Sequence, residues 1–142
     1  MEMGMISVKK LFRKAGRSME NKSLRAVIVL GINKGHGSNH ETRILEKASL
    51  AWQELAADFH QQTGIYVSAV AHKSKTIYHT EWGCPEGGED TITFTSSVNY
   101  EYVKDINAWK DTLIQLTKQL KARFEQETVT IEFEDISLIY LD

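Results

Sequence analysis

The chain is poor in cysteine and proline, with one of each among 142 residues. A single cysteine, Cys84, excludes an internal disulfide framework, so we expect a reducing compartment. The longest apolar run is far shorter than the roughly 20 residues that a membrane-spanning helix requires, and the first residues lack the apolar segment of a secretory signal. The sequence therefore predicts a cytoplasmic protein without a membrane partner.

Recognised ligand-binding motifs are also missing. There is no C-x-x-C pair and no H-E-x-x-H motif, because Ile44 stands where the stretch beginning at His40 would need a second histidine. The glycine-rich residues 31–38, GINKGHGS, match neither the P-loop nor the dinucleotide-binding pattern. We therefore expect neither a metal site nor a cofactor.

Charge is nearly balanced overall, with a formal net charge of −2, but it is unevenly distributed. Residues 1–23 hold six basic and two acidic side chains, whereas the remaining residues hold 11 basic and 17 acidic ones. The excess of acidic side chains in residues 24–142 argues against a general nucleic-acid-binding surface. We interpret residues 1–23 as a basic N-terminal extension, which either contacts an anionic partner or has no role, and residues 24–142 as a single domain.

The pattern over residues 25–64 predicts a strand, a turn and a helix. Ala26–Leu30 is an uninterrupted apolar run rich in β-branched residues, which is typical of a buried strand. Ser38 and Glu41 fit a capping box, after which apolar residues recur every three or four positions. Gly64 is a natural helix end, because glycine readily adopts the left-handed conformation found there.

The rest of the chain predicts further strands and a second helix. Residues 65–72 and 76–82 alternate about a short polar turn, which is typical of a hairpin, and residues 83–90 form a loop before a third alternating run at 91–98. A second helix begins near Asp105 and continues through Glu127, followed by a strand at 128–134. We expect a bulge or bend at Asp135, with residues 136–141 continuing extended.

This order predicts an α+β fold of the ferredoxin-like, split βαβ type with an additional strand. In such a fold an antiparallel sheet carries two helices on one face, which leaves the other face open. Soluble monomers rarely expose a large apolar patch, so the question of what covers the open face bears directly on function.

Three residues of the predicted hairpin are candidates for catalysis. With a short turn, His72, His79 and Glu81 would share the open face, because side chains alternate along a strand. Histidine titrates near neutral pH, and a histidine with a carboxylate can carry general acid–base chemistry. The alternative is a half-exposed polar sheet face or a dimer contact.

Five residues are candidates for ligand binding. His36 and Ser38 lie at the predicted start of the first helix, where free backbone N–H groups can hold an anion; the alternative is a structural turn. Trp82 and Tyr100 could line one pocket or pack their loops. Cys84 would need a base such as His79 to act as a nucleophile, and is otherwise part of a structural loop.

Two functional hypotheses follow. The first is a small cytoplasmic binding module that self-associates as a homodimer, through its open sheet face or its apolar C-terminal edge strand. The alternative is a small-molecule enzyme with a pocket near the 83–90 loop, in which His79 or His72 acts with Glu81.

Overall fold

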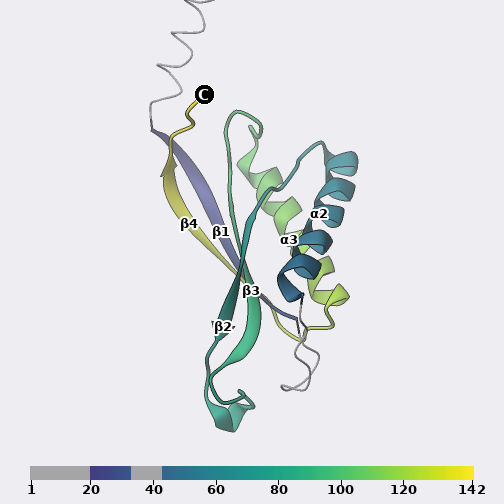
Figure 1. The fold of residues 1–142 in the computed structure, drawn as a ribbon. Coiled ribbons are helices and arrows are strands. Elements are labelled where there is room, and N and C mark those ends of the chain that lie inside the picture. The colour runs from purple at the N-terminus through teal and green to yellow at the C-terminus, as the bar shows by residue number, and fades with distance from the viewer. Residues whose placement is uncertain (1–19, 33–42) are drawn as a thin grey trace, which may run out of the picture.

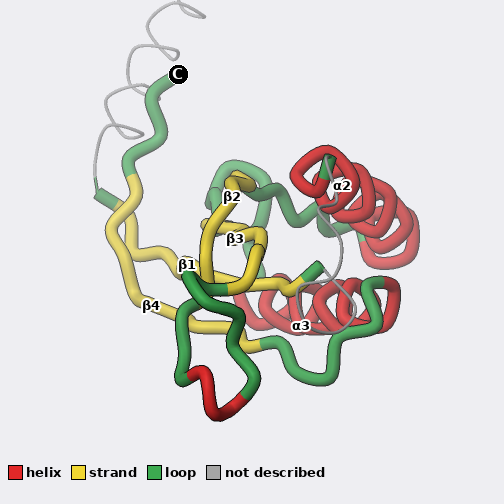
Figure 2. Tube along the Cα trace, turned by 60° about the horizontal axis from the view of Figure 1, so that its bottom comes forward, coloured by secondary structure: helices red, strands yellow, loops and turns green. Residues whose placement is uncertain are grey.

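A computed structural model describes residues 20–32 and 43–142, and Figure 1 shows its two layers. The elements follow the order β1 (Asn21–Gly31), α2 (Ile44–Thr63), β2 (Val70–Thr76), η1 (Thr80–Trp82), β3 (Glu89–Ser97), α3 (Ile106–Arg123) and β4 (Thr130–Leu138). The four strands form one sheet in the order β2-β3-β1-β4, and every neighbouring pair is antiparallel. Both helices cover the same face of this sheet (Figures 1 and 2). The predicted ferredoxin-like α+β class is therefore confirmed.

The core lies between the sheet and the two helices. Alternate residues of β1 and β3 point toward the helices and are fully or almost fully buried, among them Ile28 and Phe94, which pair across the two strands. Trp52 of α2 stacks on Phe94 with ring centroids 4.6 Å apart. Its indole N–H donates to the carbonyl of Val67 at 2.9 Å, so the one polar atom of the ring is satisfied inside the core.

The end of α2 and the start of α3 follow the sequence signals, whereas α3 ends at Arg123 and does not continue through Glu127 as predicted. Gly64 ends α2 at a φ of 77°, in the left-handed conformation that favours glycine. Asp105 caps α3, because its side chain accepts from the backbone N–H of Ala108 at 3.1 Å. The capping box of Ser38 and Glu41 lies outside the described residues, and α2 begins at Ile44.

We expect Asp105→Ala to lower the free energy of unfolding by about 1 kcal/mol, because an N–H of the first turn of α3 loses its acceptor. Asp111→Ala is the matched control, since Asp111 is exposed on the same helix beyond its first turn. It should change stability by less than about 0.5 kcal/mol. Urea unfolding measures both variants, and equal losses would contradict the capping role.

The predicted strand over residues 76–82 is not formed. β2 ends at Thr76, and its hairpin partner is β3, on the far side of a loop of residues 77–88 that contains η1. The alternating pattern was misleading because it does not bury a face: Ile77 is 77% exposed and Trp82 is 75% exposed. The additional strand of the prediction is thus replaced by a long loop at one end of the sheet.

Of the predicted bulge or bend at Asp135, the bulge is absent. Asp135 pairs with Leu24, and Ile136 pairs with Ser23, so the one-to-one register continues through that position. The division between an extension and a domain near residue 23 stays a prediction. β1 already begins at Asn21, and residues 1–19 lie outside the described part of the chain.

The open face of the sheet is rich in hydroxyl groups. The Ser74 and Thr91 hydroxyls lie 2.8 Å apart, and Thr93 donates to Ser74 at the same distance. Arg25 and Glu134 form an ion pair of 2.7 Å on the same face. Both β2 and β4 are edge strands. Self-association through this face or through β4 stays a prediction, which a monomeric mass in light scattering at high concentration would contradict.

Among the described residues, neither helix is long and apolar enough to cross a bilayer.

Candidate functional site

A groove of about 820 Å³ lies at the end of the sheet that carries the 77–88 loop. Three separate segments form it: the end of β1, the stretch from the end of β2 into β3, and the connection between α3 and β4. Its volume is within the roughly 300–1,000 Å³ typical of small-molecule sites. The lining residues are Val29, Gly31, Thr76, Tyr78, Trp82, Glu89, Thr91, Glu125, Gln126, Glu127, Thr128, Val129 and Thr130.

A second hollow, of about 580 Å³, lies between α2 and β2. Its lining is mainly apolar, from residues such as Leu45, Leu50 and Phe94. We place the candidate site in the larger groove, because that groove brings a phenol and a carboxylate together and is lined by further polar side chains.

Tyr78 and Glu89 face each other in the groove, with the phenol oxygen 3.4 Å from a carboxylate oxygen of Glu89. Desolvation by partial burial raises the pKa of Tyr78, and the neighbouring Glu89 carboxylate raises it further. Both effects penalise the charged phenolate. Tyr78 therefore stays a neutral phenol at physiological pH and can donate a hydrogen bond into the site.

The 77–88 loop can place Tyr78 there because Gly88 closes it tightly. Gly88 has a φ of +96°, and a Cβ at this position would lie 3.0 Å from a side-chain carbon of Ile77 and 3.1 Å from the carbonyl oxygen of Thr76. A residue with a side chain would be strained in conformation and crowded against backbone. The loop thus returns directly into β3, where Glu89 is the first residue.

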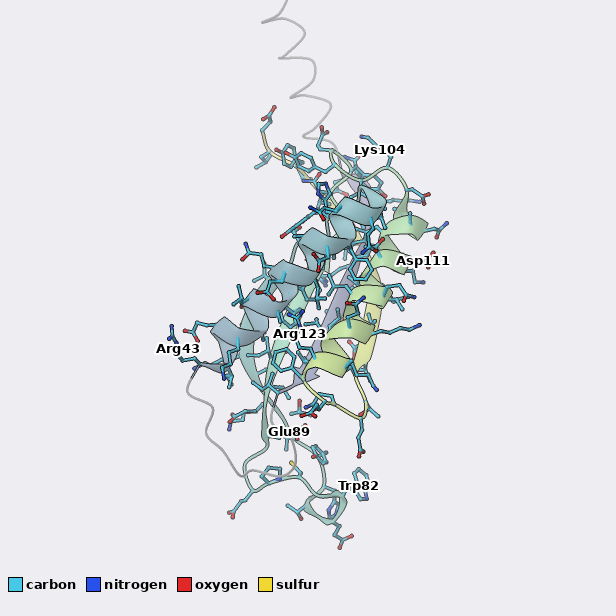
Figure 3. The ribbon with its side chains drawn as sticks, turned by 90° about the vertical axis from the view of Figure 1, so that its right-hand side faces the viewer. Arg43, Trp82, Glu89, Lys104, Asp111 and Arg123 are labelled. Atoms are coloured by element: carbon cyan, nitrogen blue, oxygen red, sulfur yellow. The ribbon has the colours of Figure 1, made fainter. Side chains whose placement is uncertain are left out.

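Trp82 lies at the edge of the groove with most of its ring exposed. It belongs to the short turn η1, and its ring centroid lies 5.6 Å from that of His79. Figure 3 shows Trp82 and Glu89 at the same end of the molecule. An exposed aromatic ring beside a groove is suited to stacking on a flat ligand such as a nucleobase.

Carboxylates dominate the charge of the described lining. Glu89, Glu125 and Glu127 all border the groove, and no lysine or arginine is among the described residues that line it. This electrostatic environment favours a ligand that carries positive charge. Two of the lining residues touch each other: the side-chain amide of Gln126 lies directly against the backbone of Gly31, where a Cβ would overlap it.

The three predicted catalytic residues are not brought together in this groove. His79 caps η1, and its Nδ1 accepts from the backbone N–H of Glu81 at 3.0 Å, while both side chains remain exposed. His72 is exposed on β2, on the open face of the sheet. None of the three lines the groove, and their catalytic role stays a prediction.

The predicted ligand-binding residues divide into three groups. Trp82 lines the groove, and Cys84 is buried behind it against the backbone of Tyr78. Tyr100 does not share a pocket with Trp82. Its carbonyl accepts from Lys104, which lies at the opposite end of the molecule in Figure 3. His36 and Ser38 lie outside the described residues.

Tyr78, Glu89 and Gln126 are site residues that sequence reasoning missed. Glu89 lies in the predicted glycine-rich loop of residues 83–90, which is the one local signal that pointed near the site. Tyr78 fell in a predicted strand facing the helices, and Gln126 fell in a predicted helix. Their convergence depends on how β1, β3 and the α3–β4 connection meet in space.

One protein-family model and several solved structures match this chain. The model of the SAM lyase family matches residues 21–142. A phage SAM lyase solved in complex with S-methyl-5′-thioadenosine is 18% identical, with a TM-score of 0.51, over 83% of this chain and 90% of that chain. A phage SAM lyase in the apo state is also 18% identical, with a TM-score of 0.48, over 85% of this chain and 90% of that chain.

A third solved structure, a hydantoinase/carbamoylase family amidase from Burkholderia ambifaria, is 11% identical, with a TM-score of 0.40. It covers 84% of this chain but 29% of that chain. The likeness to solved structures shows the fold alone, because all of these identities are low. No curated protein matches the sequence significantly.

The family match overturns the first functional hypothesis. A binding module whose function is self-association does not account for a match to an enzyme family over residues 21–142. The alternative, a small-molecule enzyme with a pocket near the 83–90 loop, is better supported. An open sheet face does not by itself indicate an interaction surface, because here that face carries hydroxyl hydrogen bonds and an ion pair of its own.

Proposed function

The chain belongs to the SAM lyase family, and on that premise we propose that it cleaves S-adenosylmethionine, with S-methyl-5′-thioadenosine as one product. The family match over residues 21–142 carries the proposal. The related phage SAM lyase solved with S-methyl-5′-thioadenosine supports the choice of product.

The two molecules differ in a way that identifies the bond to be broken. S-adenosylmethionine is a sulfonium cation whose sulfur bears a methyl group, an adenosyl group and an aminobutyrate chain. S-methyl-5′-thioadenosine keeps the first two groups. The reaction therefore breaks the bond between sulfur and the γ-carbon of the chain, and the electron pair of that bond passes to sulfur, which becomes a neutral thioether. The γ-carbon must gain a new bond as it loses sulfur, and the substrate's own carboxylate can supply it by attacking that carbon and closing a five-membered lactone ring. The second product is then an aminolactone that keeps the α-ammonium charge, so atoms and charge balance without a further reactant. Since the sulfonium is already a good leaving group, the protein's main task is to bind and orient the substrate.

The charges along the groove suit this substrate. We assign the Glu89 carboxylate to the α-ammonium group of the amino acid end, because that group keeps its charge throughout the reaction. A carboxylate beside the sulfonium would instead stabilise the substrate more than the transition state, in which the charge on sulfur is disappearing. The neutral phenol of Tyr78 lies 3.4 Å from Glu89. It either holds the Glu89 carboxylate in place or donates a hydrogen bond to the carboxylate of the substrate.

We assign Trp82 to the adenine ring, and expect Trp82→Ala to weaken binding of S-methyl-5′-thioadenosine about tenfold. Stacking of a base on an aromatic side chain is worth about 1–3 kcal/mol, and the ring is exposed enough that its removal should leave the fold intact. Isothermal titration calorimetry measures the affinity. Trp82→Phe is the control and should keep most of it, whereas equal affinity in all three proteins would contradict this assignment.

The activity itself is tested by incubating purified protein with S-adenosylmethionine and separating the nucleosides by chromatography. We expect one S-methyl-5′-thioadenosine for each substrate consumed, at a rate above that in buffer alone or with heat-denatured protein. S-adenosylhomocysteine, which is a neutral thioether, should remain uncleaved. Product formation no faster than in buffer would refute the proposed function.

We also propose that the reaction takes place in the cytoplasm. The single cysteine supports this location, because proteins of oxidising compartments commonly use disulfides.

A further inference from the structure

We propose that Cys84 is a positioning residue for this cleavage: its sulfur holds the backbone of Tyr78 and thereby aims the phenol at Glu89. This inference rests on the proposed function for the part that concerns catalysis. The part that concerns the position of Tyr78 is independent of the substrate.

The sulfur of Cys84 joins both limbs of the 77–88 loop. The backbone N–H of Tyr78 donates to Sγ at 3.5 Å. The thiol is placed to donate to the carbonyl oxygens of Thr76, at 3.8 Å, and Pro85, at 3.3 Å. Thr76 is the last residue of β2, and Pro85 lies on the limb that returns to β3. One buried atom thus ties the outgoing limb to the returning limb.

The burial of Cys84 fits a structural role of its thiol better than a nucleophilic one. Its side chain is 6% exposed, so attack on a ligand in the groove would require the loop to open. A nucleophilic thiol also needs a base within hydrogen-bond reach. The contacts of this sulfur described above are with backbone groups of the 77–88 loop and of Thr76 at the end of β2. We therefore assign it no covalent step.

The contact between Tyr78 and Glu89 is sensitive to the position of the loop. At 3.4 Å the two oxygens are farther apart than the roughly 3.0 Å upper limit usual for an O–H···O hydrogen bond, so a small displacement of Tyr78 would end their contact. Displacement of a positioning group by about 1 Å can cost about 100-fold in rate. Because the N–H of Tyr78 itself is held by Cys84, loss of the sulfur acts on this residue directly.

The test compares Cys84→Ala with Cys84→Ser, which keeps a hydroxyl able to accept from Tyr78 and donate to a carbonyl. We expect Cys84→Ala to lower kcat/KM for S-adenosylmethionine cleavage about tenfold, with much of the loss as a higher KM, and Cys84→Ser to lose less than about threefold. In a Tyr78→Phe background, Cys84→Ala should change kcat/KM less than about twofold, because the group that it positions is already gone. Equal losses in both backgrounds would overturn the inference.

A second measurement, the NMR signal of the Tyr78 ring, does not depend on enzymatic activity. In protein with ¹³C-labelled tyrosine, the ring signal of Tyr78 is identified by its loss in Tyr78→Phe. It should move in Cys84→Ala and stay near its original position in Cys84→Ser. A Tyr78 signal that stays in place in Cys84→Ala overturns the positioning role, whether or not the wild-type protein cleaves the substrate. Should Cys84→Ala fail to fold, Cys84→Val fills the same space without the hydrogen bonds and takes its place in both measurements.

Discussion

Glu89→Gln is expected to lower kcat/KM for S-adenosylmethionine about 100-fold, which corresponds to about 2.7 kcal/mol of transition-state stabilisation. The substitution keeps the size of the side chain but removes its charge. Hydrogen bonds to a charged group are worth about 1.5–3 kcal/mol, and Glu89 is the groove carboxylate that lies against the Tyr78 phenol. Because the α-ammonium keeps its charge as the C–S bond breaks, we expect much of the loss to appear as a higher KM.

Glu132→Gln is the matched control for this prediction. It makes the same change of charge on β4, at an exposed position that does not line the groove. Initial rates over a range of substrate concentrations should leave this variant within about twofold of the wild type. An equal loss in the two variants would mean that overall charge, rather than the site, governs the reaction. Full activity in Glu89→Gln would contradict the assignment of the active site to this groove.

The architecture could largely be predicted because its signals are local. The apolar run Ala26–Leu30 suits a central strand, which β1 is, and the cap at Asp105 and the stop at Gly64 each act within one helical turn. The failure over residues 76–82 has an equally local cause. Alternation of residue types cannot by itself tell a half-buried strand from an exposed loop, and here the loop residues Ile77 and Trp82 are exposed.

The site could be predicted only in part, because it is assembled from distant segments. Trp82 and Cys84 were among the predicted residues, since they flank or lie in the conspicuous glycine-rich loop. Tyr78 and Glu89 are 11 positions apart and meet because the loop folds back on itself. Periodicity does not predict that closure. From the sequence alone, histidines are better candidates for acid–base chemistry than a tyrosine, because their ordinary pKa is near neutrality. The raised pKa of Tyr78 keeps its phenol neutral, so that it can donate a hydrogen bond.

Trp109→Ala is expected to lower the free energy of unfolding by about 3–5 kcal/mol, the cost typical of removing a large buried aromatic side chain. Trp109 lies on α3, is 1% exposed and belongs to the core between the helices and the sheet. A loss of that size is a large share of the 5–15 kcal/mol that stabilises a typical domain.

Urea unfolding followed by the fluorescence of the buried Trp52 measures this loss. Trp82→Ala removes the same side chain from a position that is 75% exposed and should cost less than about 1 kcal/mol. If Trp109→Ala does not fold, Trp109→Phe should still fold and show a smaller loss, because the phenyl ring fills part of the space. A cost for Trp109→Ala no greater than that for Trp82→Ala would contradict a core built around α3. The sheet end that forms the groove would then need another source of rigidity, since the α3–β4 connection that lines it is anchored by this helix.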